Sequence, residues 1–279
     1  MSVRVVTDSA CDLSDELIAE LGIEIVPLTI RFGSEEFVDR TELTNADFWR
    51  RMAASPVLPE TAAPSAGAFE AAFQSLAENG ATGIVCINLS SKLSSTMQSA
   101  QIAAKVFGPD FPVEVIDSLS VSMGLGRLCM TASQLATSGA DLDTIVAEVI
   151  DQRDRTKLFG VLDTLDNLRK GGRIGNARAL LGSVLSIKPV VEVRDGAVEE
   201  AGKVRTRSNA MRALVDKVKE GPVENLSVLQ GDAPDVDELL EMLDPIVARS
   251  EIVVGQIGPV IGTHGGPRVL GVTFQQPHA

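Results

Sequence analysis

Residues 84–89, Ile-Val-Cys-Ile-Asn-Leu, form a mostly apolar run that is followed at once by a helical pattern. A run of this length and composition predicts a strand that is buried on both faces. Further apolar runs at 3–6, 23–32 and 113–116 alternate with helical patterns in the same way. This alternation predicts an α/β fold, in which helices flank a parallel sheet.

The pattern changes after residue 156. Apolar runs at 187–193 and 197–204 are separated by Arg194-Asp195-Gly196, and an Asp-Gly pair between two strand patterns is typical of a hairpin. Hairpins mixed with helices predict an α+β unit with a mixed sheet. A chain of 279 residues is long enough for two domains, which we expect at 1–156 and 157–279.

Hydroxyl side chains are concentrated directly after the strand predicted at 84–89. They are Ser90, Ser91, Ser94, Ser95 and Thr96. Hydroxyls and free backbone N–H groups at the start of a helix favour an anion, and open α/β sheets bind ligands at the carboxyl ends of their strands. We therefore expect an anion site here, although one serine that caps a helix beside others that face solvent is also consistent with the pattern.

Charge and composition exclude several classes of protein. The net charge of −13 argues against a surface that grips nucleic acid or an anionic membrane. Apolar residues make up 44% of the chain but aromatic residues only 4%, without any tyrosine, so the interior is mainly aliphatic. Such an interior suits an aliphatic ligand, although an ordinary core has the same composition.

The three cysteines are scattered, and their spacing matches neither a metal site nor a disulfide framework. The N-terminal residues lack a signal-peptide pattern, and no apolar run reaches the ~20 residues that a membrane span needs. We expect a cytoplasmic protein without stable membrane insertion and without a bound metal.

Two further polar residues are candidates for the anion site. His264 is one of only two histidines and lies between glycines in a predicted loop, where its imidazole can donate to a carboxylate or phosphate, or serve the structure alone. Thr61 lies in a predicted loop at 56–64, and it matters only if that loop faces the hydroxyl cluster. No serine, histidine and acid arrangement for nucleophilic catalysis is evident.

Basic residues also stand out in this acidic chain. Lys170, Arg173, Arg205 and Arg207 either form an ordinary solvated face or contact a phosphate or a partner. The glycines at 171–175 match neither a Walker A loop nor a dinucleotide-binding fingerprint.

In the order and content of its motifs, the chain resembles the DegV family, and in particular bacterial fatty-acid-binding proteins of the FakB type. The resemblance runs nearly end to end. Its motifs stand at 7–9, 61–65, 89–100, 116–118, 162–165, 171–174, 185–189, 203–207 and 262–267.

The resemblance implies two α/β domains that hold a long-chain fatty acid between them, the second closing an aliphatic tunnel. It further implies that Thr61, His264 and a serine of the 90–91 pair, with Ser91 preferred, grip the carboxylate. Related proteins present the acid to an ATP-dependent fatty acid kinase, which forms the acyl phosphate. Arg173 and Arg205 fall in motifs suited to the head group or to that partner. No catalytic residue and no cofactor other than the fatty acid are implied.

Several positions depart from the usual family pattern. Ala62 and Ala63 replace a serine and a glutamine, Ser95 replaces a glycine, and Arg268 replaces a glycine. From these changes we expect a shift in head-group contacts or in chain preference. Two other functions stay open: an enzyme for a phosphorylated or carboxylated small molecule that uses Asp8, Asp117 and His264, and a regulatory module that senses a lipid.

Overall fold

The computed structural model describes residues 3–180 and 187–278. A four-stranded parallel sheet forms its first half, in the order β2-β1-β6-β7. The strands are β1 (Val3–Asp8), β2 (Glu24–Val26), β6 (Gly83–Asn88) and β7 (Val113–Asp117). Every residue of β6 is buried, as its continuous apolar sequence predicts.

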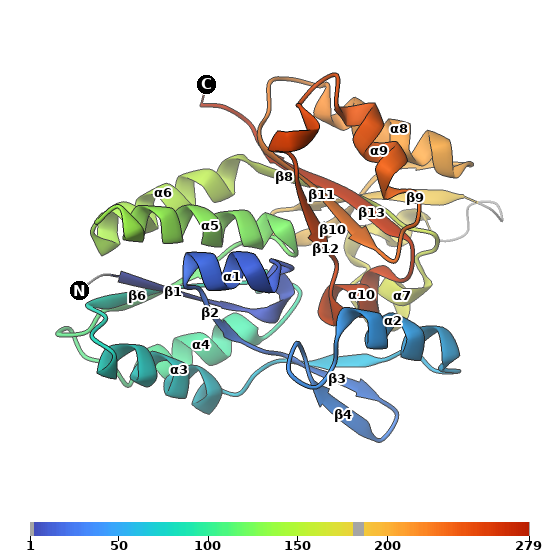
Figure 1. Ribbon diagram of the computed structural model, residues 1–279. Coiled ribbons are helices and arrows are strands. Elements are labelled where there is room, and N and C mark those ends of the chain that lie inside the picture. The colour runs from blue at the N-terminus through green and yellow to red at the C-terminus, as the bar shows by residue number, and fades with distance from the viewer. Residues whose placement is uncertain (1–2, 181–186, 279) are drawn as a thin grey trace.

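Helices cover both faces of this sheet (Figure 1). They are α1 (Asp15–Leu21), α3 (Ala66–Glu78), α4 (Thr96–Ala104), α5 (Met123–Thr137) and α6 (Leu142–Arg155). Helices α3 and α4 lie together below the sheet in Figure 1, and α5 and α6 lie above it. The hydroxyls of Ser14 and Ser65 accept hydrogen bonds from backbone N–H groups in the first turns of α1 and α3, so a serine caps the start of each helix.

A six-stranded mixed sheet forms the second half, in the order β10-β9-β8-β13-β11-β12. Its strands are β8 (Thr156–Val161), β9 (Lys188–Arg194), β10 (Ala197–Val204), β11 (Glu224–Gly231), β12 (Val253–Gln256) and β13 (Val269–Gln275). Phe159 and Val161 pack with the helices α8 (Arg207–Val218) and α9 (Val236–Leu243), whereas Leu158 faces the other way. The antiparallel β9–β10 hairpin confirms the Asp-Gly prediction.

A third, smaller antiparallel sheet has the order β4-β3-β5. Its strands are β3 (Thr29–Phe32), β4 (Glu35–Val38) and β5 (Glu60–Ala62), and α2 (Asn45–Ala54) connects β4 to β5. The short helices α7 (Asp166–Lys170) and α10 (Pro259–Gly265) and the 3₁₀ turns η1 (Ser9–Cys11), η2 (Gly175–Leu180) and η3 (Arg249–Glu251) complete the fold.

Helix α5 joins the two larger sheets, because it contacts β1 and β6 on one side and β8, β11 and β13 on the other. Its buried Arg127 donates from Nε to the Ser227 hydroxyl, 2.7 Å away, and from Nη2 to the Leu226 carbonyl. One apolar core also runs from Val5 in the first sheet to Leu229 in the second. The domain boundary predicted at residue 156 falls where α6 ends and β8 begins, and the division into 1–156 and 157–279 stays a prediction.

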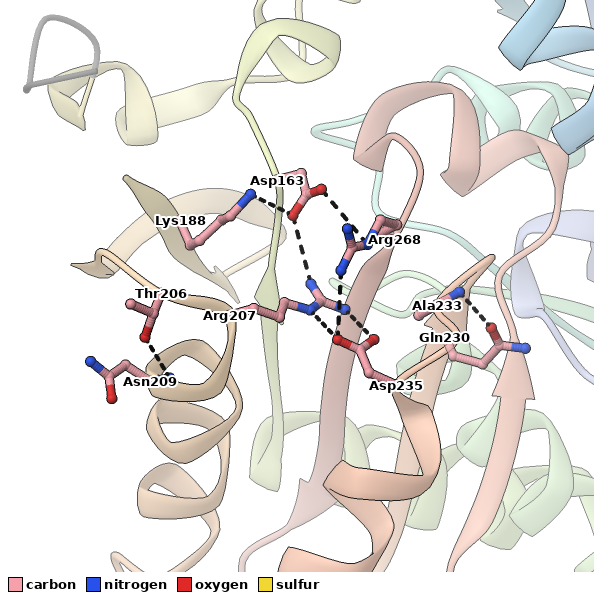
Figure 2. Close-up of polar contacts among 9 residues, drawn as sticks. All are labelled: Asp163, Lys188, Thr206, Arg207, Asn209, Gln230, Ala233, Asp235 and Arg268. Carbon is pink, nitrogen blue, oxygen red and sulfur yellow. Dashed lines mark hydrogen bonds and ion pairs between the residues drawn. The ribbon is translucent and has the colours of Figure 1, made fainter. Parts of the chain in front are cut away.

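A network of charged side chains fastens one end of the six-stranded sheet (Figure 2). Arg207 donates to both carboxylate oxygens of Asp235, over 2.7 and 3.0 Å, which lowers the pKa of Asp235. Lys188 donates to Asp163 over 2.8 Å, and Arg268 lies within 4 Å of both carboxylates. Lys188, Arg207 and Asp163 belong to motifs of the resemblance, and the network gives them a structural role. Leu185 and Ser186 of the same motifs lie outside the described residues.

The predicted fold class, a parallel sheet flanked by helices plus a mixed sheet, is confirmed. Two segments differ from the sequence prediction. The predicted loop at 56–64 contains β5, which is held by pairing with β3, and the predicted loop around His264 is the helix α10, which begins with Pro259. Within residues 3–180 and 187–278, none of the helices is both long and apolar enough to cross a membrane.

Candidate functional site

An apolar cavity lies between the six-stranded sheet, helix α10 and the loops that follow β6 and β7. Its volume is about 110 Å³. The sheet provides Leu158, Val191, Val193, Val198, Leu229 and Val269, and Leu162 follows directly after β8. The facing elements provide Leu28, Leu89, Leu93, Val121, Val260 and Ile261. A cavity this size holds several water molecules, but it offers them few polar partners and so favours an apolar ligand.

Thr61 and His264 meet at the edge of this cavity, although 203 residues separate them in the chain. The Thr61 Oγ1 and His264 Nε2 atoms lie 3.1 Å apart, at hydrogen-bond distance. Pairing of β5 with β3 fixes Thr61 opposite Ile30, and α10 holds His264 in its last turn. The sequence predicts both residues as ligands of one anionic group, and the structure brings them together.

His264 is partly buried, and loss of solvation lowers its pKa to about 4, with a further contribution from the positive charge of Arg173. The imidazole of the free protein is therefore neutral at pH 7. Its Nδ1 atom is buried without a hydrogen-bond partner in the described part of the chain. An added Cβ at Gly171 would lie 2.4 Å from that atom, so the glycine lets the backbone pass close to the ring.

Arg173 reaches the same cavity and supplies its positive charge. Its Nε donates to the Leu93 carbonyl over 3.1 Å, and its Nη1 donates to the Gly171 carbonyl over 2.7 Å. These two bonds hold the guanidinium in place between the loop after β6 and the turn after α7. A fixed guanidinium is a strong partner for a carboxylate or phosphate.

Ser94 is the one residue of the predicted serine cluster that lines the cavity described above. Its hydroxyl lies 2.9 Å from the Thr96 hydroxyl and accepts a hydrogen bond from the Thr96 backbone N–H. The side chain is half-buried. Thr61, Ser94, Arg173 and His264 thus bring two hydroxyls, one imidazole and one guanidinium to a mainly apolar cavity. The hydroxyl of Ser122, which also lines the cavity, donates to Asp12.

Ser90 and Ser91 do not line the cavity, so the geometry favours Ser94 over the preferred Ser91, whose role as carboxylate ligand stays a prediction. Ser90 is fully buried and donates to the Gly196 carbonyl over 2.7 Å, which ties the end of β6 to the β9–β10 hairpin. Ser91 is exposed and donates to Asp117 over 2.5 Å. Ser95 is exposed too, so neither its hydroxyl nor its added bulk compared with glycine reaches the cavity.

The backbone N–H groups at the end of β6 are already occupied by the protein's own carboxylates. Asp8 accepts from the Leu89 N–H over 2.9 Å, and Asp117 accepts from the Ser91 N–H over 3.2 Å. These anions take the place that the sequence analysis assigned to a ligand. The carboxylates at the end of β6 therefore belong to the protein itself.

Asp8 and Asp117 do not join His264 in a catalytic arrangement. Neither carboxylate is among the residues that line the two pockets beside His264. Asp8 is buried under η1, and burial raises its pKa to about 6. The geometry on which the enzyme alternative depends is therefore absent from the described residues.

A second, polar pocket adjoins the apolar cavity on its outer side. Thr61, Arg173 and His264 line both, and Glu60, Lys170 and Asn167 line the polar pocket alone. Sequence reasoning did not identify Asn167, whose side chain donates to the Thr263 carbonyl over 3.0 Å and so braces α10. Arg205 lies elsewhere, exposed before α8, and Ala62 and Ala63 line neither pocket.

Comparisons with known proteins agree with this architecture. Residues 2–276 match the model of a family described as "Uncharacterised protein, DegV family". A DegV domain-containing protein of Streptomyces coelicolor is 35% identical over 277 residues, which cover 97% of each chain.

Two solved structures are similar over almost their whole length. One, described as showing fatty acid binding of a DegV family protein from Thermus thermophilus, has a TM-score of 0.91 and 30% identity, with 99% of this chain and 100% of that chain covered. The other, a stearic acid-binding protein from Eubacterium ventriosum, has a TM-score of 0.85 and 25% identity, with 98% of each chain covered. With its motifs, its fold and these relatives in agreement, the chain belongs to the DegV family.

Proposed function

We propose that this protein binds a long-chain fatty acid, with the acyl chain in the apolar cavity and the carboxylate at Thr61, Ser94, Arg173 and His264. The observation that carries the proposal is the arrangement of these four polar side chains around a mainly apolar cavity, in which the hydroxyl of Ser122 is already bonded to Asp12. The fatty acids bound by the similar structures from Thermus thermophilus and Eubacterium ventriosum support it.

The energetics favour a ligand with one long apolar part. Each buried CH₂ group contributes ~0.8 kcal/mol, so a sixteen-carbon chain gains on the order of 10 kcal/mol before the costs of binding. A carboxylate enters such a site only where it is compensated. The Arg173 guanidinium provides the charge, and the two hydroxyls donate hydrogen bonds, while neutral His264 holds the Thr61 hydroxyl in place.

The position of the polar pocket supports a role in presenting the acid to another protein. Because Thr61, Arg173 and His264 lie between the apolar cavity and the polar pocket, a carboxylate held by them faces outward while the chain is enclosed. We propose that a cytoplasmic, ATP-dependent fatty acid kinase acts on this carboxylate to form the acyl phosphate, and that the protein itself is a non-catalytic carrier. Exposed Arg205 is then a partner contact and not a head-group ligand.

Binding is tested on protein purified from cells and on protein stripped of lipid. Mass spectrometry of an extract should detect a fatty acid, and stripped protein should bind hexadecanoic acid. Thr61→Val should weaken that binding, and Thr144→Val, at an exposed threonine on α6, should not. Failure of wild-type protein both to carry and to bind a fatty acid would refute the proposal.

The partner is tested separately. Loaded protein, a bacterial fatty acid kinase and ATP should yield an acyl phosphate, which hydroxylamine traps as a hydroxamate. Arg205→Glu should reduce this yield without changing the affinity for the acid. Product formation by the loaded protein and ATP alone would contradict the carrier role and favour an enzyme.

A further inference from the structure

Two glycines lie directly opposite each other at the centre of the six-stranded sheet. Gly160 of β8 pairs with Gly271 of the antiparallel strand β13. On the outer sides of this pair, Gly160 is opposite Val191 of β9, and Gly271 is opposite Leu229 of β11. All four residues line the apolar cavity. These four residues form a row across the sheet, with aliphatic side chains at its two ends and no side chain at its two central positions.

The same sheet face carries large side chains on both sides of this row. Residues two positions apart on an extended segment share a face, so Leu158 of β8 and Leu162 flank Gly160. Leu162 directly follows β8, and its N–H still donates to the Pro189 carbonyl of β9. Leu158 and Leu162 both line the cavity. The glycine pair is thus a gap in a wall that is otherwise built of leucine and valine.

The two glycines differ in what the fold requires of them. An added Cβ at Gly271 would lie 2.8 Å from the Phe159 carbonyl oxygen and 3.0 Å from Leu229, so packing excludes a side chain there. An added Cβ at Gly160 would meet its nearest atom, in the Val191 side chain, at 3.6 Å, which is an ordinary contact. Neither glycine has the positive φ that only glycine adopts readily.

Glycine inside a strand is otherwise unfavourable, because it has no side chain to pack and loses more conformational entropy on folding than other residues. Packing does not explain why residue 160 is a glycine, because an added Cβ would make only ordinary contacts there. The space above it opens into the cavity.

We propose that Gly160 determines which acyl chains fit, because its missing side chain provides the room that the hydrocarbon occupies against the sheet. This inference rests on the proposed fatty-acid binding. From the cavity edge at His264, the wall runs past Val269, then Gly271 and Gly160, and then Leu158. Each of these two-residue steps spans about 7 Å, so the gap lies partway along a long chain.

The test compares Gly160→Ala and Gly160→Val with wild type, using decanoic and hexadecanoic acids as probes. The valine side chain displaces methylene groups from the gap, so Gly160→Val should bind hexadecanoic acid at least tenfold more weakly, and Gly160→Ala should fall in between. Binding of decanoic acid should fall by a smaller factor, because less of its chain passes the gap. Gly221→Ala, in an exposed loop with no atom within 4 Å of the added Cβ, is the matched control.

Thermal unfolding of the stripped proteins shows whether each variant is folded, and the smaller Gly160→Ala change keeps the test decisive if the valine variant does not fold. Equal binding of hexadecanoic acid by folded Gly160→Ala, Gly160→Val and wild type would overturn the role of Gly160 alone. If wild type binds neither acid, the proposed function fails as well.

Discussion

Asp12 and Gly258 join the first half of the protein to helix α10. The Gly258 backbone N–H donates to Asp12 Oδ1 over 2.9 Å, and the Ser122 hydroxyl donates to Asp12 Oδ2 over 2.5 Å. Asp12 is buried, and burial raises its pKa to about 7. Since α10 carries His264 at its other end, this carboxyl group holds the helix that positions the imidazole.

Replacement of Asp12 by alanine should lower the free energy of unfolding by at least 1–3 kcal/mol, because it leaves buried hydrogen-bond donors without an acceptor. Asp12→Asn should be much closer to wild type. Asparagine keeps one acceptor, and it tolerates the left-handed backbone found at this residue (φ 52°) better than alanine does. Urea unfolding of the two stripped variants measures the difference, and equal losses in both would contradict this account.

The pKa of His264 predicts a specific pH dependence of stability. The pKa is about 4 in the folded protein and about 6.5 in the unfolded chain, so only the unfolded chain takes up this proton between those values. Neutral His264 therefore contributes up to about 3 kcal/mol to the free energy of unfolding above pH 6.5, and this contribution is lost as the pH falls through 4. We expect the unfolding free energies of wild type and His264→Gln to diverge in this range, with wild type losing more.

This comparison must use stripped protein, since a bound carboxylate near His264 favours the protonated ring. His264→Gln serves as the reference because the buried carboxyl groups of Asp8, Asp12 and Asp39 titrate in both proteins. Their raised pKa values act with the opposite sign, giving stability that is lost as the pH rises through 6 to 7. Parallel pH profiles for the two proteins would show that His264 does not titrate as described.

Ser94 and Ser91 should differ sharply when each is changed to alanine. Ser94 lines the cavity, and a hydrogen bond to a charged group contributes about 1.5–3 kcal/mol, so Ser94→Ala should bind hexadecanoic acid roughly tenfold or more weakly. Ser91→Ala removes only an exposed contact with Asp117 and should bind it like wild type. Isothermal calorimetry on both variants decides between them, and a larger loss in Ser91→Ala would restore the original choice.

Arg268 occupies a position where glycine is usual in the family, and its backbone explains why. Its φ of 60° lies in the left-handed region, which costs a residue with a side chain about 1 kcal/mol. Its half-exposed ion pairs with Asp163 and Asp235 offset part of that cost.

We therefore expect Arg268→Gly to be about as stable as wild type and Arg268→Ala to be about 1 kcal/mol less stable than Arg268→Gly. Alanine loses the ion pairs and keeps the backbone strain. Thermal or urea unfolding measures the order of the three proteins, and an alanine variant at least as stable as the glycine variant would argue against strain at this residue.

Sequence patterns predicted those parts of the fold that depend on interactions between residues close together in the chain. The continuous apolar run of β6 and the Asp-Gly turn after β9 each have one favourable structure, and both were correct. The helix α10 was missed because the two glycines within it and the two that flank it suppress any helical pattern, while packing against α2 and α7 holds it.

The sequence did not show which serine of the cluster lines the cavity, for a different reason. Nothing near Ser91 in the sequence shows that Asp117, 26 residues away, accepts its hydroxyl and N–H hydrogens. The prediction that Thr61 and His264 lie together is confirmed. It came from the family resemblance and not from any pattern around these residues. The contact between two residues 203 positions apart depends on the complete fold.

The place of β13 in its sheet has a consequence for synthesis of the protein. This strand is the last one in the chain, yet it lies between β8 and β11 and provides Val269 and Gly271 to the cavity. A growing chain can complete the parallel sheet early, since chains fold from the N-terminus as they emerge. The wall against which an acyl chain would lie cannot close until β13 has emerged from the ribosome, so we expect lipid loading only after that strand has joined its sheet.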